Sequence, residues 1–373
     1  MVTKFRAGWL LFHRWVGIVL GIVIAVLGVS GSLLVFDTEI DAALNPHLLR
    51  VQPAGTPRSF DAIVQAAADA HPGWTPRYLQ RGSDDPTASV MVLLRDGAQA
   101  EKQVFVNPYT LAVLGERSGM SAIALVRHIH GELLMGEAVG GTIVGVLSFL
   151  CAAFFIAGAV LWWPAKGGVK RALTIKIGSE TPRLMRELHN VFGAGPAVLF
   201  ILASITVPPL VWMGSTDGGG GGSGSGAGGP AREGAPPQAP AQAPPQTPPR
   251  MLTWDEAAAF AATEAPGQYV GLILRQEGPR GIYMVRFWPP GETGVSKQSN
   301  VIMPLAGGRI IRVQRPAPFS PASIYKTDFA ANVHSGAILG LPGRLVMFAA
   351  GLFLPVLFVT GLAMWWMKRR RAV

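Results

Sequence analysis

The sequence predicts an α-helical integral membrane protein with four transmembrane helices, built by tandem duplication, and two small α+β domains outside the membrane. Three observations support this fold class. The 373 residues are 49% hydrophobic and only 14% charged, whereas average composition includes about 25% charged residues. Long apolar stretches interrupt the chain, and its two halves repeat one pattern of histidine, glycine and tryptophan.

Four apolar stretches are long enough to cross a hydrocarbon core about 30 Å thick, which takes about 20 residues of helix. Helix is expected because lipid cannot satisfy exposed backbone groups. The stretches are Val16–Phe36, Ala138–Ala165, Leu188–Thr216 and Leu345–Met367, and all four lack Asp, Glu, Lys and Arg. We assign residues 1–44, 128–166, 188–216 and 332–373 to four membrane regions and residues 167–187 to a loop.

Basic residues near the helix ends predict the orientation, because short cytoplasmic loops carry an excess of Lys and Arg. This pattern places both termini and the loop 167–187 in the cytoplasm and the two long segments outside. The formal charge of +10 has the same origin, so we expect contact with membrane lipid and not with nucleic acid. The basic residues are Lys4, Arg6, Arg14, Lys166, Lys170, Arg171, Lys176, Arg183, Arg186 and Lys368 to Arg371.

The two outside segments, residues 45–127 and 251–331, are each large enough for one small core. Ser59 begins a capped amphipathic helix in the first, and Thr253 to Glu256 resembles a capping box in the second. Residues 217–250 contain ten glycines and eight prolines, which predicts a disordered linker. Alternating apolar residues predict strands at Ser89–Arg95, Lys102–Asn107, Gly281–Trp288 and Val301–Pro304.

Four of the seven histidines stand at matched positions in the two halves. His13 and His189 lie at the cytoplasmic ends of helices, and small residues follow each at +4, +8 and +15 on one helix face. Those residues favour either close helix packing or a flat ligand against the helix. His130 and His334 each precede a glycine by six residues, and Pro342 with its neighbouring glycines predicts a helix break that leaves both histidines on short outer segments.

Two histidine pairs, each with one residue from each half, predict two nitrogen-ligand sites. Cys151 is the only cysteine, which excludes cysteine-ligated zinc and iron–sulfur clusters. Zinc also needs three or four protein ligands, whereas haem b needs two axial nitrogens and an apolar slot. We therefore expect two haem b groups, one held by His13 and His189 and the other by His130 and His334.

Other residues leave alternatives open. His128 is the alternative to His130, because the two side chains point about 200° apart on a helix. Arg127 and Arg344 are candidates for pairing with haem propionates or for anchoring at the interface. The four matched histidines could instead bond to carbonyl groups or lipid headgroups without any cofactor. His47 and His71 are expected to be surface residues without partners.

The histidine-centred motifs resemble those of the PepSY-associated transmembrane proteins, often labelled iron-regulated membrane proteins, which include ferrisiderophore reductases. The matching residues are Leu11-Phe12-His13-Arg14-Trp15-Val16-Gly17, Glu187-Leu188-His189-Asn190-Val191-Phe192-Gly193, the segments ending at Trp163 and Trp366, and His334 to Gly343 with Thr360-Gly361. The resemblance covers all four helices, and it implies that the outside segments are PepSY-like domains. It also implies a bacterial inner-membrane location with periplasmic outer domains and, in the reductase branch, electron transfer through haem.

These observations lead to the hypothesis of a transmembrane ferric reductase. Electrons from an unidentified cytoplasmic or quinol donor would pass through both haem groups and reduce a ferric siderophore or another ferric chelate in the periplasm. Reduction releases iron because oxygen ligands hold ferrous iron more weakly. Two other functions remain open: a periplasmic binding or assembly factor anchored by four helices, and a divalent-metal transporter.

Overall fold

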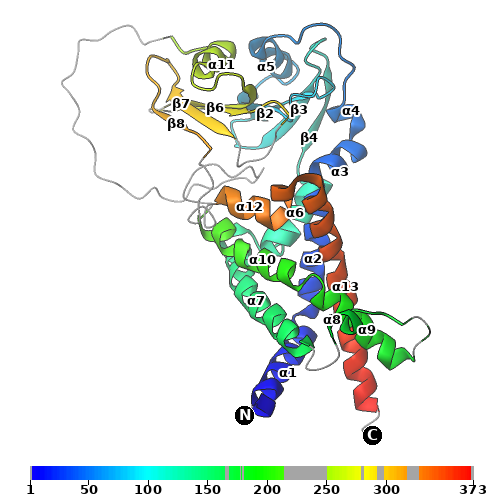
Figure 1. Ribbon diagram of the computed structural model, residues 1–373. Coiled ribbons are helices and arrows are strands. Elements are labelled where there is room, and N and C mark those ends of the chain that lie inside the picture. Colours follow the sequence, from blue (N-terminus) through cyan, green and yellow to red (C-terminus); the bar gives the residue numbers. More distant parts are fainter. Residues whose placement is uncertain are drawn as a thin grey trace, which may run out of the picture. The chain divides into compact units, whose positions relative to one another are not determined.

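The computed structural model describes residues 2–163, 168–176, 178, 180–213, 250–278, 281–291, 298–316 and 327–370 (Figure 1). These residues divide into two compact units. The helical unit lies within residues 1–44, 120–220 and 317–373, and the sheet unit lies within residues 45–119 and 221–316. The predicted linker, residues 217–250, falls outside the described residues except for Arg250.

Two helices of the helical unit are long and apolar enough to cross a membrane. The first comprises a π-helical turn at Glu137–Gly141 and α7 (Thr142–Trp162), and the second comprises a 3₁₀ turn at Ala337–Leu339 and α13 (Gly340–Arg370). Their outward-facing apolar side chains include Phe149 and Val359. Such exposure fits contact with lipid, because soluble proteins rarely leave large apolar patches uncovered.

The other two apolar stretches are bent pairs of helices. The pair α1 (Val2–Val19) and α2 (Gly21–Val35) bends by 66°, and the pair α9 (Thr181–Ala194) and α10 (Ala197–Pro208) bends by 52°. Two helices, or up to four if each bent pair is one span, could therefore cross a membrane among the described residues. The sequence predicted one unbroken helix in each place.

A proline marks one bend, and a close contact with another helix marks the other. Pro196 lies between α9 and α10, and proline has no backbone N–H to continue the helix. Gly21 begins α2, and the ring of Phe358 from α13 occupies the space that a Cβ at Gly21 would need. The bend between α1 and α2 thus lies where a side chain of α13 packs directly against the backbone at Gly21.

Short helices precede both unbroken spans, as the glycine and proline pattern predicted. α6 (Ala122–Glu132) ends before the π-helical turn, and α12 (Thr327–Ser335) ends before the 3₁₀ turn. Gly136, Gly336 and Gly340 have positive φ angles of 79°, 77° and 64°, which glycine adopts without a Cβ clash. Within the helical unit, α6 and α12 lie at the end opposite to the chain termini (Figure 1).

The remaining helical elements are short. α3 (Asp37–Leu44) follows α2, and α8 (Val169–Ala172) precedes α9. A π-helical turn at Pro209–Met213 follows α10.

The sheet unit holds one eight-stranded antiparallel sheet in the order β4-β3-β2-β1-β5-β6-β7-β8. The sequence predicted two separate small domains, but β1 and β5 pair directly, with Leu79 opposite Ile273. In either half alone, β1 or β5 would be an edge strand with unpaired backbone N–H and C=O groups. Such an edge promotes aggregation, and the β1–β5 pairing removes it. The strands are β1 (Thr75–Arg81), β2 (Val90–Arg95), β3 (Glu101–Val106), β4 (Val113–Ser118), β5 (Tyr269–Gln276), β6 (Ile282–Trp288), β7 (Ser299–Pro304) and β8 (Arg312–Gln314).

Two helices cover one face of this sheet, α5 (Phe60–Asp69) and α11 (Trp254–Ala262), while α4 (Pro46–Leu49) precedes them in the chain (Figure 1). Both predicted helix starts are present: Ser59 accepts the N–H of Ala62, and Thr253 and Glu256 form a complete capping box. Side chains from both halves form a single buried core that includes Ile63, Leu79, Val92, Tyr283 and Phe287.

Candidate functional site: two facing histidine pairs

The structure brings His13 and His189 together as a first pair. His13 lies on α1 and His189 on α9, two helices far apart in the sequence. Their ring centroids are 6.2 Å apart, and the ring planes cross at 87°. The two imidazoles, far apart in the sequence, are therefore close neighbours with nearly perpendicular planes.

His130 and His334 form a second pair of the same kind. His130 lies on α6 and His334 on α12, and their ring centroids are 6.0 Å apart with ring planes at 61°. His128 lies on the same helix as His130 but contacts Glu132, with 3.1 Å between Nδ1 and Oε2. Of the two candidates on α6, His130 is the one that faces His334.

All four histidines have a backbone carbonyl as a hydrogen-bond partner, and in three of them it lies beside Nδ1. The Nδ1 atoms of His13, His130 and His334 lie 3.2, 2.9 and 3.0 Å from the carbonyl oxygens of Phe154, Leu27 and Ala203. His189 Nδ1 lies 3.0 Å from Thr360 Oγ1, and the Leu357 carbonyl is also a hydrogen-bond partner. Because a carbonyl oxygen can only accept, Nδ1 carries the proton, and in the neutral imidazole Nε2 then keeps its lone pair.

Glycines make room for three of the rings. A Cβ would lie 2.7 Å from Cε1 of His130 at Gly31, 3.0 Å from Cε1 of His13 at Gly158, and 3.3 Å from Cε1 of His189 at Gly361. Each glycine follows the carbonyl-bearing residue by four positions, one helical turn on the same face. The supporting helix thus offers the imidazole a carbonyl acceptor and, one turn later, a glycine whose missing side chain leaves space for the ring.

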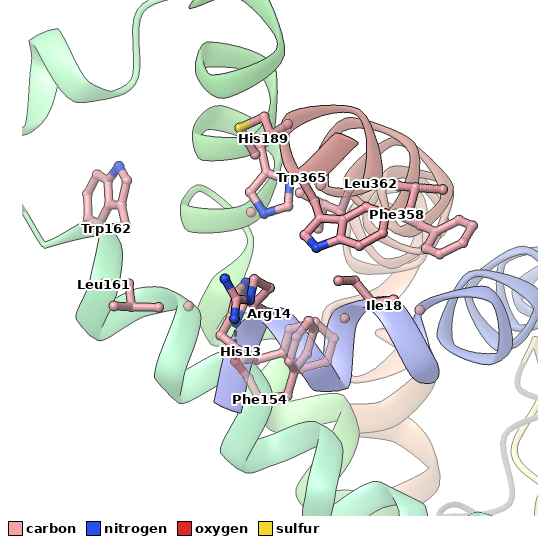
Figure 2. Close-up of a pocket in the computed structure, with 18 of the residues that line it drawn as sticks. His13, Arg14, Ile18, Phe154, Leu161, Trp162, His189, Phe358, Leu362 and Trp365 are labelled. Carbon is pink, nitrogen blue, oxygen red and sulfur yellow. Dashed lines mark hydrogen bonds between the residues drawn. The ribbon is translucent and has the colours of Figure 1, made fainter. Parts of the chain in front are cut away.

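The first pair lines a cavity of about 390 Å³. Figure 2 shows side chains from α9 and α13, among them His189, Phe358 and Trp365, facing His13, Ile18 and Phe154 from α1 and α7. Most of the lining is apolar. Polar and basic groups also line the cavity, from Arg14, Trp162, Asn190 and Lys368.

The small residues predicted to line one helix face divide between two roles. Gly17, Gly21 and Gly193 line the cavity. Gly28 packs against α13, where a Cβ would lie 2.6 Å from the carbonyl oxygen of Gly351. Close helix packing is therefore confirmed at Gly28, whereas a flat ligand against the cavity-lining glycines stays a prediction.

The two arginines named from the sequence contact α3 of the helical unit. Arg127 pairs with Asp37 at 2.7 Å, and Arg344 pairs with Glu39 at 2.7 Å and donates to the Val35 carbonyl. Propionate contacts for these arginines remain a prediction.

Of the remaining histidines, His47 is exposed as predicted, but the prediction for His71 was wrong. Its Nε2 lies 2.7 Å from Glu116 Oε2 and its Nδ1 lies 3.0 Å from the Ala67 carbonyl oxygen. The partner Glu116 comes from a strand 45 residues later, so local sequence gave no sign of it.

Sequence reasoning missed the groups that hold the imidazoles. Ser30, Thr206 and Thr360 lie 3.2, 3.1 and 3.0 Å from the Nδ1 atoms of His130, His334 and His189. The ring of Phe154 stacks on His13 with centroids 4.3 Å apart. The sequence does carry a signal for two of these groups, because Ser30-Gly31 and Thr360-Gly361 each place a hydroxyl residue before a glycine.

The side chains that could act as metal ligands limit which metal ions the protein could hold. Within the described residues, no group of three or more His, Cys, Asp or Glu side chains converges as a metal site. A tetrahedral zinc site of protein ligands needs at least three. The geometry instead brings imidazoles together in twos.

Comparison with known families agrees with the resemblance seen in the motifs. Residues 10–368 match the family model described as the PepSY-associated TM region. No curated protein matches the chain at a significant level. Because the matched region includes all four paired histidines and nearly the whole chain, this membrane protein belongs to the PepSY-associated transmembrane family.

Proposed function

We propose that this protein is a di-haem reductase of the bacterial inner membrane that carries electrons from the cytoplasmic side to a ferric chelate in the periplasm. The observation that carries the proposal is the presence of two close histidine pairs in which every Nδ1 lies beside a hydrogen-bond acceptor, an arrangement that leaves Nε2 for a metal. The four membrane spans and their tandem duplication belong to the same proposal. The basic residues at the helix ends support cytoplasmic termini.

The spacing of each pair fits one haem iron. A metal in line between the two rings, about 2.0 Å from one nitrogen of each and with that nitrogen about 1.1 Å from its ring centroid, requires centroids about 6.2 Å apart. The observed separations are 6.2 and 6.0 Å. The carbonyl partners at Nδ1 are also the usual outer contacts of metal-bound imidazole, which fix the ring and raise its basicity.

The cavity around the first pair fits a flat apolar group with an acidic edge. Its volume of about 390 Å³ lies within the range of cofactor sites, about 300–1,000 Å³. The indole N–H of Trp162 is buried without a hydrogen-bond partner, and a buried unpaired donor is costly. With Arg14 and Lys368, it would hold the carboxylates of the cofactor.

Haem bound at both pairs would supply reversible one-electron transfer. The residues between the pairs form a close-packed aromatic series. Phe154 contacts Phe155 with ring centroids 5.3 Å apart, and Phe155 contacts Phe200 at 4.9 Å. Phe200 lies one turn before Ala203, whose carbonyl accepts from His334. Phe155 and Phe200 are buried in one apolar cluster, and Phe154 packs against it.

The first experiment is the visible spectrum of the purified full-length protein. We expect the Soret and α bands of low-spin haem b, and two haem groups per chain by pyridine haemochromogen assay. A protein that remains colourless after expression with ample haem would contradict the proposal.

Single histidine variants test the pairing. His13→Ala or His189→Ala should remove one low-spin signal, and His130→Ala or His334→Ala should remove the other. His128→Ala is the matched control because it lies on α6 but contacts Glu132. If His128→Ala removes a signal and His130→Ala does not, the assignment of the second pair is wrong.

Activity is tested in proteoliposomes. Reduced donor on the side of the termini should generate ferrous iron from an external ferric chelate, detected with a ferrous-specific chromophore. Without any such reduction in protein loaded with two haem groups, the reductase assignment fails while the haem sites stand.

A further inference from the structure

Three of the four histidines have a hydroxyl group beside Nδ1 in addition to the carbonyl. The hydroxyl residue always follows the carbonyl residue by three positions: Ser30 follows Leu27, Thr206 follows Ala203, and Thr360 follows Leu357. In each case both groups lie on one supporting helix. The arrangement is therefore repeated at His130, His334 and His189.

The hydrogen bonds fix the direction in which these hydroxyl groups act. Ser30 Oγ donates into its own helix, 2.7 Å from the Val26 carbonyl oxygen. Thr206 Oγ1 lies 2.9 Å from the Leu202 carbonyl oxygen, and Thr360 Oγ1 lies 2.7 Å from that of Val356. A hydroxyl has one proton to donate and two lone pairs, so each oxygen is left to accept from the imidazole.

His13 is the exception. Its carbonyl partner is Phe154, and the residue three positions later is Ala157, which is fully buried. One position further on, Gly158 makes room for the ring of His13, as Gly31 and Gly361 do for His130 and His189. The first pair thus has one hydroxyl acceptor, at Thr360, and the second pair has two.

We propose that Ser30, Thr206 and Thr360 are positioning residues that tune the reduction potential of the metal centre held by each histidine pair, and that Ala157 withholds this contribution at His13. The inference rests on the proposed haem function and deepens it. An additional acceptor at Nδ1–H makes the imidazole a more basic ligand. A more basic ligand favours the ferric state and lowers the potential.

Two substitutions at the first pair should act in opposite directions. Thr360→Val keeps the shape of the side chain and removes the acceptor, so the potential should rise. Ala157→Ser adds the missing acceptor, so the potential should fall. Mutation of residues that hydrogen-bond to metal ligands typically changes metal affinity 10- to 100-fold. We expect about a tenfold change in the ferric-to-ferrous equilibrium, or about 59 mV for one electron.

The experiment is a spectroelectrochemical titration of full-length protein, with the first site assigned by the signal lost in His13→Ala. Thr360→Ser should restore the wild-type potential because it returns the hydroxyl. Ser204→Ala is the matched control: Ser204 is a buried hydroxyl near Thr206 that donates to the Phe200 carbonyl at 2.8 Å. Removing it should leave both potentials unchanged.

The outcomes separate this inference from the function on which it rests. Wild-type protein with two haem signals, whose potentials do not move in Thr360→Val and Ala157→Ser, would overturn the tuning role alone. If Thr360→Val loses its haem, the Ala157→Ser potential decides the matter. A colourless wild-type protein would overturn the haem proposal and the inference together.

Discussion

Asp61 and Asp255 each cap the other's helix. The carboxylate of Asp61 accepts the N–H groups of Trp254 and Asp255 at 2.9 and 3.1 Å. The carboxylate of Asp255 accepts the N–H groups of Phe60 and Asp61, both at 2.9 Å. Two negative charges thus lie together at two helix N-termini, where the free backbone N–H groups and the helix dipoles favour them.

This pair predicts an unusual pH dependence of stability. Burial and the facing Asp61 raise the pKa of Asp255 above its usual value. For Asp61, burial acts to raise the pKa, but hydrogen bonds from Asp255, Thr253 and the backbone outweigh it and leave the pKa lowered. Asp255 therefore binds its proton more tightly when folded, so its contribution to stability increases as pH falls through that raised pKa. The contribution of Asp61 is lost only at lower pH.

Asp255→Asn should abolish the gain in folding stability that wild type shows on mild acidification. We expect the melting temperature of the variant to vary less than that of wild type between about pH 4 and 7, measured by circular dichroism in detergent. Asp69→Asn, an exposed carboxylate on α5, is the control and should keep the wild-type profile. An unchanged profile in Asp255→Asn would show that the two carboxylates do not interact.

Gly31→Ala should disturb the second histidine pair selectively. The added Cβ would lie 2.7 Å from Cε1 of His130, so the ring must move away from its carbonyl and from His334. The haem signal assigned to His130 and His334 should weaken or change spin state while the other remains. Gly131→Ala is the control, because no atom lies within 4 Å of a Cβ built there.

Trp162→Phe should weaken retention of the cofactor at the first pair. The indole N–H is buried without a partner, and the proposed partner is a cofactor carboxylate. We expect faster loss of haem from the first site to apomyoglobin, by about 5- to 10-fold for a hydrogen bond of roughly 1–1.5 kcal/mol. Trp163→Phe changes the adjacent, 67% exposed indole and should have no effect. Equal rates in both variants would remove Trp162 from the site.

The two haem signals should differ in electron paramagnetic resonance. The imidazole planes cross at 87° in the first pair and at 61° in the second. Nearly perpendicular planes leave two iron d orbitals almost equal in energy, so the first site should give the more anisotropic low-spin spectrum. His13→Ala should remove that spectrum. If it removes the less anisotropic one, the ring orientations are reversed.

Leu79→Ala tests whether the sheet unit unfolds as one body. Leu79 is fully buried and lies opposite Ile273 at the β1–β5 junction. We expect a loss of about 2–5 kcal/mol and a matching loss of hydrogen-exchange protection in β6, which belongs to the other half of the sequence. Val113→Ala, 37% exposed on β4, should cost little. Protection lost only in β1–β4 would indicate two independent domains.

Composition and local pattern predicted much of this architecture because those signals are short in range. The apolar helices, the break near Gly340, the caps at Ser59 and Thr253 and four of the strands follow from neighbouring residues. The matched spacing of His13, His189, His130 and His334 also predicted which rings would meet, because a repeated sequence gives related positions in space.

What the sequence did not reveal depends on contacts between distant segments. Ser30 and His130 are 100 residues apart, and no spacing rule connects them. The pairing of β1 with β5 is equally non-local, and the bend at Gly21 arises where a side chain of α13 packs against it. Such contacts are set by tertiary packing, which overrides local preference.

The β1–β5 pairing also imposes an order on biosynthesis. Almost 190 residues separate the end of β1 from the start of β5, so the ribosome would need roughly 10–40 s to deliver the second strand after the first. During that time β1 has β2 on one side and bare backbone N–H and C=O groups on the other. A nascent chain in this state is a target for chaperones and a hazard for aggregation.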